Sequence, residues 1–126
     1  MHTVAQLRSF DTAAKDAGMS EQEIEDLVTY LSENPEAGDE MTGTGGCRKV
    51  RLAGRGKGKS GGYRTVTFFS GDSMPVYLIT VFSKGEKSNL TALECRALKE
   101  ITKRIVNEHR GKVSVLAESR KKGVTR

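Results

Sequence analysis

The chain has 126 residues, 36% of them hydrophobic and 29% charged, and carries a formal net charge of +5. This length suits one domain, and no apolar run approaches the roughly 18–20 residues of a membrane-spanning helix. The N-terminus lacks a secretory layout, and Cys47 and Cys95 show no metal-binding spacing. We therefore expect a cytoplasmic protein with reduced thiols, no membrane contact, no metal and no cofactor.

The charges are segregated along the chain. Residues 1–40 hold ten acids and two bases, residues 41–71 hold seven bases and no acid, and residues 72–126 hold twelve bases and six acids. A solvated basic surface would interleave acids with the bases. Their absence over the middle segment favours a partner that is a polyanion, such as nucleic acid.

The N-terminal part predicts a short strand and two helices. Residues 2–7 alternate weakly, and apolar positions then recur at helical spacing over Phe10–Ala17. Ser20 and Glu23 form a capping box that begins a second helix, and Pro35 ends it. The apolar stripe of this helix consists of Ile24, Leu27, Val28 and Leu31.

The remaining chain predicts three strands and a third helix. The strands cover residues 47–53, 63–69 and 75–82, and the last is apolar enough to be buried on both faces. Thr91 and Glu94 form a second capping box, which begins a helix that ends near Arg110. Its apolar stripe consists of Leu98, Ile101 and Ile105.

These elements predict one α+β domain over residues 1–110. Their order is β-α-α-β-β-β-α, with two N-terminal helices and a C-terminal helix packed on a small antiparallel sheet. Residues 111–126 form a basic tail, for which an edge strand is possible and disorder is the favoured expectation.

A glycine-rich basic segment connects the first two of the three later strands. Residues 53–60, AGRGKGKS, approximate the spelling of a phosphate-binding P-loop. A P-loop needs a helix beginning at its Lys-Ser, but here two glycines and a β-rich run, Tyr63–Phe69, follow. The segment therefore predicts a hairpin rather than a nucleotide site.

This hairpin brings basic residues together. Lys49 and Arg51 are two apart and share one face of their strand, and Arg64 opens the partner strand. We expect the three to line an open sheet face. The loop that overhangs it carries Arg55, Lys57 and Lys59.

Two long segments carry a family resemblance. GTGGCRKVRLAGRGKGKSGGYRTVTFF and YLITVFSKGEKSNLTALE, together with Asn-Pro-x-x-Gly at residues 34–38, strongly resemble the RelE/HigB family of bacterial type II toxins. The branch that they resemble most is HigB-like. The resemblance covers roughly residues 1–108 and implies a ribosome-dependent endoribonuclease that cleaves mRNA in the A site of the 70S ribosome. It also implies a cognate antitoxin as partner.

The resemblance also implies the site residues. Lys49 and Arg51 match the family's basic pair, Arg64 matches the arginine that opens the next strand, and Lys84 lies in a segment where members place further bases. These four are the predicted catalytic residues. The predicted RNA- and ribosome-binding residues are Arg48, Arg55, Lys57, Lys59 and Lys87.

Basic side chains suit RNA cleavage by the 2′-hydroxyl. Fixed cations stabilise the extra negative charge that forms on the phosphate. The planar guanidinium group of an arginine can also donate two parallel hydrogen bonds to the phosphate oxygens. We assign this clamp to Arg51 and Arg64. Lys49 is the candidate acid or base, since crowding by other cations lowers the pKa of a lysine.

Two other functions stay open. The same fold is compatible with a ParE-like inhibitor of DNA gyrase, although the basic pair and the glycine-rich loop argue against it. A catalytically inactive basic module that binds RNA or ribosomes is the other alternative. It is motivated by Phe82, where close relatives have a tyrosine, and by Gly85, where several have an arginine.

Overall fold

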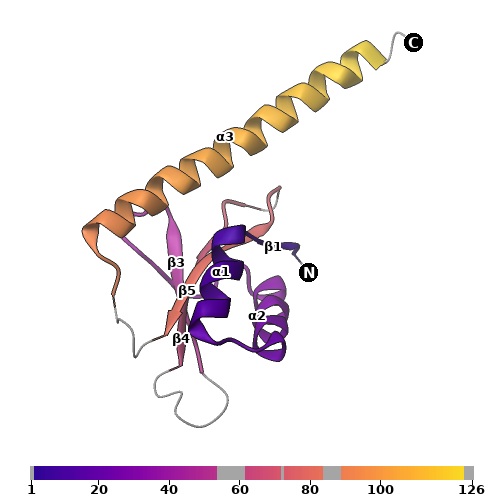
Figure 1. The fold of residues 1–126 in the computed structure, drawn as a ribbon. Coiled ribbons are helices and arrows are strands. Elements are labelled where there is room, and N and C mark those ends of the chain that lie inside the picture. Colours follow the sequence, from indigo (N-terminus) through magenta and orange to yellow (C-terminus); the bar gives the residue numbers. More distant parts are fainter. Residues whose placement is uncertain (1, 54–61, 72, 84–88, 124–126) are drawn as a thin grey trace.

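The computed structural model describes residues 2–53, 62–71, 73–83 and 89–123 as three helices on a five-stranded sheet (Figure 1). The strand order is β1-β5-β4-β3-β2. In chain order the elements are β1 (Val4–Gln6), α1 (Arg8–Ala17), α2 (Glu21–Glu33), β2 (Asp39–Glu40), β3 (Cys47–Leu52), β4 (Tyr63–Phe68), β5 (Val76–Ser83) and α3 (Ala92–Gly123). The α+β class is confirmed.

The sheet is mixed, and here the prediction of an antiparallel sheet is wrong. β1 runs parallel to β5, from the pair Val4–Val76 to the pair Gln6–Leu78, whereas the other neighbours are antiparallel. A hairpin turn imposes antiparallel pairing, but the chain between β1 and β5 contains two helices and three strands. Nothing in the local sequence therefore indicates whether β1 and β5 run parallel or antiparallel.

Helix ends follow the predicted caps. The hydroxyl of Ser20 accepts from the Glu23 amide at 3.1 Å, and the Glu23 carboxylate accepts from the Ser20 amide at 2.9 Å. Thr91 and Glu94 repeat this box at the start of α3. Gly18 ends α1 in the left-handed region, at φ 79°, where a glycine has no steric penalty.

α3 is longer than predicted. The helix continues to Gly123, past the expected end at Arg110, and its second half extends beyond the rest of the fold (Figure 1). The possible edge strand after residue 111 is wrong, because this segment is helical up to Gly123, whereas the flexibility expected of the tail stays a prediction. Within the described ranges, no helix is long and apolar enough to cross a membrane.

The two faces of the sheet carry separate cores. One core joins α1 and α2 to the sheet and includes Phe10, Leu27 and Leu78. The other lies on the opposite face under α3 and includes Val66 and Leu98. Between them β4 is buried at all six positions.

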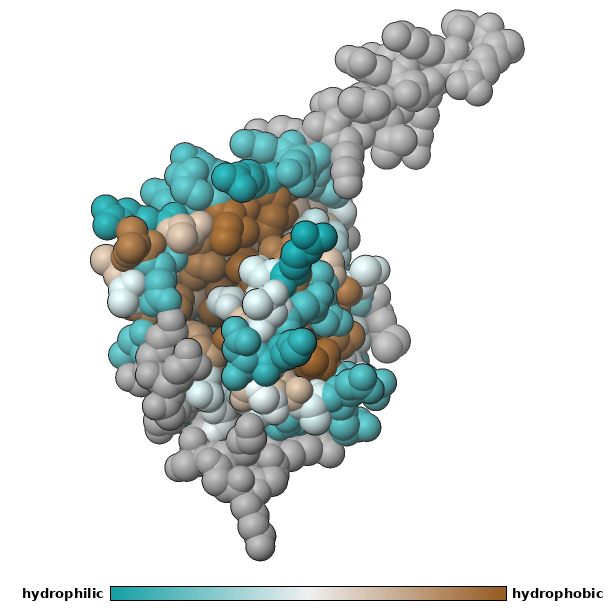
Figure 2. Space-filling view, viewed as in Figure 1, coloured by the Kyte–Doolittle hydropathy of each residue, from teal (hydrophilic) through white to brown (hydrophobic). Residues whose placement is uncertain are grey.

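An apolar groove of about 310 Å³ lies between α1 and α3, over β5. Its lining includes Ala13, Ile79 and Leu98, and Figure 2 shows the apolar surface that gathers there.

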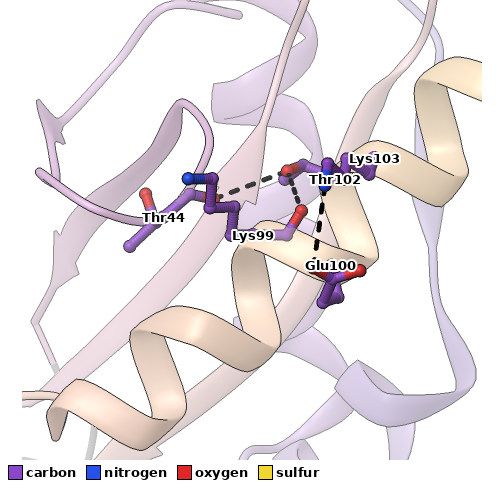
Figure 3. Close-up of polar contacts among 5 residues, drawn as sticks. All are labelled: Thr44, Lys99, Glu100, Thr102 and Lys103. Carbon is purple, nitrogen blue, oxygen red and sulfur yellow. Dashed lines mark hydrogen bonds and ion pairs between the residues drawn. The ribbon is translucent and has the colours of Figure 1, made fainter.

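A buried turn before β3 holds α3 in place (Figure 3). The Thr44 hydroxyl accepts from the Cys47 amide at 3.0 Å, and the Thr44 carbonyl accepts from the Thr102 hydroxyl at 3.5 Å. Gly45 packs against Thr102 so closely that a Cβ at this position would overlap the threonine oxygen. On the exposed side of the same helical turn, Lys103 and Glu100 approach to 3.9 Å.

Candidate functional site

β3 and β4 bring three predicted site residues to one end of the sheet. Arg51 and Arg64 are direct partners across the strand pair, and Lys49 lies two residues before Arg51. Because side chains alternate along a strand, all three lie on the same face. The predicted arrangement of these cations is confirmed, whereas their catalytic role stays a prediction.

Arg64 is the most enclosed of the three cations. Its side chain is 6% exposed, and its Nη1 donates to the Tyr63 carbonyl at 3.3 Å. On its other side, its strand partner is Phe82 of β5, which is 3% exposed. An arginine keeps its charge at any physiological pH, and screening by water is weak at such a position. Arg64 therefore supplies a fixed positive field.

The three cations line a pocket of about 400 Å³. This pocket lies where β2 begins, at Asp39, and β2 pairs only with Arg48 and Lys49. Beyond that point, in the described part of the chain, no strand covers the outer edge of β3. The pocket is also lined by Tyr30, Gly38 and Asp39. Cations thus occupy its β3 and β4 side, and an aromatic ring and a carboxylate its α2 and β2 side.

Lys49 connects the pocket to the segment before α3. Its Nζ donates to the Asn89 Oδ1 at 3.4 Å, and its strand partner is Asp39. The side chain is half-buried. A long lysine stem held in this way keeps the ammonium group within the site instead of extended into solvent.

Arg48 lies on the opposite face from Lys49. Its Nη1 donates to the Gly38 carbonyl at 3.0 Å. Gly38 has φ 93°, and a Cβ there would lie 2.5 Å from the Lys49 carbonyl oxygen. This close approach requires glycine and fixes the wall of the pocket. Arg48 therefore has a structural contact, and its predicted role in RNA binding stays a prediction.

Five predicted residues lie outside the described residues: Arg55, Lys57, Lys59, Lys84 and Lys87. The flanking strands still show where their segments begin. Leu52 pairs with Tyr63, and Tyr63 pairs with Ser83. Both segments therefore leave from the end of the sheet that carries Arg51 and Arg64. A strand, not a helix, follows the glycine-rich loop, which confirms the argument against a P-loop.

Three residues at this site were not predicted from the sequence: Tyr30 and Asp39, which line the pocket, and Asn89, which accepts from Lys49. Asp39 and Asn89 lie in segments without periodicity, and a two-residue strand such as β2 has no recognisable pattern. Tyr30 lies in the acidic segment of the chain, so its neighbours in sequence gave no signal. The structure places it beside the clustered bases with its side chain 48% exposed, an arrangement typical of nucleic-acid binding.

The other described tyrosines lie apart from this pocket. Tyr63 is buried, and its hydroxyl donates to the Glu23 carboxylate at 3.4 Å. Tyr77 lies on the part of β5 next to β1, where burial and then the charge of Glu108 raise its pKa. His2 packs edge-to-face on Phe69. Within the described ranges, no cluster of three His, Cys, Asp or Glu could hold a metal ion.

A comparison with protein families agrees with the RelE part of the resemblance, whereas the HigB-like branch stays a prediction. A family model described as the RelE toxin of the RelE/RelB toxin–antitoxin system matches residues 2–122. The match extends past residue 108, where the resemblance was expected to end. A doubly substituted variant of the E. coli toxin RelE, solved in the free state, is 20% identical, with a TM-score of 0.49 over 82% of this chain and 97% of that one. The chain belongs to the RelE toxin family.

Proposed function

We propose that this chain is an endoribonuclease that cleaves mRNA in the decoding site of the ribosome and so inhibits translation. The observation that carries the proposal is the enclosed Arg64 beside Arg51, with Lys49 in the same pocket. Such a site fits a phosphodiester, whose negative charge increases in the transition state, because preorganised cations act strongly where water is scarce.

The cleavage needs no external nucleophile. The RNA 2′-oxygen bonds to the adjacent phosphorus as its proton leaves, and the bond from phosphorus to the 5′-oxygen breaks. The products are a 2′,3′-cyclic phosphate and a 5′-hydroxyl, so one proton is removed and one is delivered. Arg51 and Arg64 would hold the non-bridging oxygens. Lys49, whose ammonium group is held by Asn89, is the candidate for proton transfer.

The test is translation of a defined mRNA with purified protein, with breaks mapped by primer extension. Breaks should appear only when ribosomes are present. Arg51→Ala should reduce their rate by about 10²-fold, as expected for loss of one transition-state contact. Arg51 is exposed, so this change should preserve the fold. Arg8→Ala, an exposed arginine on α1, is the matched control and should cleave normally.

Two results would reject the proposal. Full cleavage by both Arg51→Ala and Arg64→Lys would remove the site from the mechanism. Intact mRNA with ribosome-bound protein would instead support the inactive binder. That alternative rests on Phe82, an apolar side chain that faces Arg64 across the strand pair. Arrest of replication before translation would support a gyrase inhibitor.

A cognate antitoxin is the proposed protein partner. The family is defined by a toxin–antitoxin pair, and this chain is expected to be neutralised in the same way. Coexpression of the neighbouring reading frame should restore growth of cells that produce the chain. Growth arrest that persists with every adjacent frame would contradict this part of the proposal.

A further inference from the structure

The cationic pocket has two chemically different sides. Arg51 and Arg64 lie on strands of the sheet, whereas Tyr30 comes from α2 and Asp39 from β2. A nucleotide has the same division, since its phosphate is an anion and its base offers an aromatic face and N–H donors. A nucleotide therefore fits the pocket in only one orientation, with its phosphate on the arginines and its base on the side of Tyr30 and Asp39. In the reverse orientation the phosphate would face the Asp39 carboxylate.

Tyr30 suits the base side of such a ligand. It is 48% exposed although it lines the pocket, so its ring is accessible. Tyrosine rings stack on the bases of single-stranded RNA. The pocket volume of about 400 Å³ lies at the lower end of the range for small-molecule sites, roughly 300–1,000 Å³, which is appropriate for one nucleotide.

Asp39 suits the edge of the base. It is exposed and is the strand partner of Lys49. A carboxylate accepts hydrogen bonds and donates none, so it favours bases with an exocyclic amino group. Adenine, cytosine and guanine have one. Uracil has none and presents carbonyl oxygens over most of its edge.

We propose that this pocket binds one nucleotide next to the cut, with its base stacked on Tyr30 and its amino group on Asp39. Tyr30 and Asp39 are then specificity-determining residues that disfavour uridine at that position. This inference rests on the proposed function for the identity of the ligand as RNA.

The first experiment measures cleavage on ribosomes whose A-site codons differ by one base at each position flanking the cut. The wild type should cleave uridine codons least at one of the two positions. Asp39→Asn should narrow that preference by about 10-fold, since an amide can also donate to a carbonyl of uracil. The control Glu33→Gln removes an exposed charge at the end of α2 and should keep the preference.

Tyr30 is tested with two variants that separate stacking from proton transfer. Tyr30→Phe keeps the ring and should cleave within about twofold of the wild type, whereas Tyr30→Ala should lose roughly 10-fold or more, as for loss of one stacked base. Thr29→Ala, an exposed neighbour outside the pocket, is the control. Equal losses in Phe and Ala would overturn stacking, and so would full activity of Tyr30→Ala.

A binding measurement keeps the inference testable if the wild type cleaves nothing. The probe is a short RNA with 2-aminopurine next to a 2′-deoxy position, which cannot be cut. Stacking on Tyr30 should quench its fluorescence in the wild type and in Tyr30→Phe, and Tyr30→Ala should abolish the quenching. Absence of quenching in the wild type would overturn the inference, whereas quenching without cleavage would contradict only the proposed activity.

Discussion

Burial raises the pKa of the Cys47 thiol from 9.0 to about 11. Loss of solvent around the thiolate is the largest cause, a hydrogen bond with Thr44 lowers the value in part, and the charge of Cys95 raises it further. Cys47 is fully buried in the core under α3. The folded core therefore disfavours the ionised thiolate.

This shift predicts a loss of stability in alkali. Between pH 9 and pH 11 the folded state keeps a proton on Cys47 that the unfolded state has lost. The contribution is fully present below pH 9 and falls as pH rises, by at most about 3 kcal/mol. Urea unfolding at pH 8, 9 and 10 measures it. In Cys47→Ala, the free energy of unfolding should fall less steeply as the pH rises. Part of the pH dependence that remains comes from Tyr77, whose pKa is also raised in the folded state.

At the scale of elements, a glycine turn determines how β3 meets α3. Gly43 and Gly45 have nearly the same φ, 80° and 78°, but their surroundings differ. A Cβ at Gly43 meets nothing within 4 Å, whereas one at Gly45 overlaps Thr102 and approaches the backbone of Lys99. Only the second glycine is needed for packing as well as for backbone conformation.

This pair predicts unequal effects of alanine. Gly43→Ala should cost about 1–2 kcal/mol of unfolding free energy, for the left-handed backbone alone. Gly45→Ala adds the displacement of α3, so we expect it to cost a further 1–3 kcal/mol or so. Chemical denaturation of both variants measures the difference. Equal losses would show that α3 adjusts without strain.

Local chemistry explains which elements were predictable. Both capping boxes and the alternation of β3 and β4 depend on residues near each other in sequence. The direction of β1 and the position of Tyr30 depend on contacts between distant segments. The cluster of Lys49, Arg51 and Arg64 was predictable because one hairpin creates it. The position of Asp39 in the pocket could not be predicted, because it depends on the close packing of Gly38 against Lys49.

The whole molecule has an acidic layer and a basic layer. Residues 1–40 carry ten acids and two bases, and most of them form α1 and α2 on one side of the sheet. The opposite side carries exposed Arg51, half-buried Lys49 and enclosed Arg64, and α3 adds exposed Lys99 and Lys103. Such a charge distribution orients a protein before it contacts a polyanion.

This layering predicts strongly salt-dependent binding to ribosomes. The logarithm of the binding constant should fall linearly with the logarithm of the salt concentration. Arg51→Ala should reduce that slope by about one, the value for one lost phosphate contact. Arg8→Ala removes the same charge from the acidic layer and should leave the slope unchanged. Cosedimentation with ribosomes at several KCl concentrations measures both.

The parallel pairing of β1 with β5 determines when the sheet can form during synthesis of the protein. β1 is the first strand to be synthesised and β5 the last, so the sheet cannot close until residue 83 has been made. Until then α1 and α2 have no complete surface on which to bury their apolar stripes. The cationic pocket lies on β3 and β4, which precede β5 in the chain and lie on the side of β5 opposite to β1 in the sheet. The cationic pocket therefore lacks its complete supporting sheet until synthesis of the chain is well advanced.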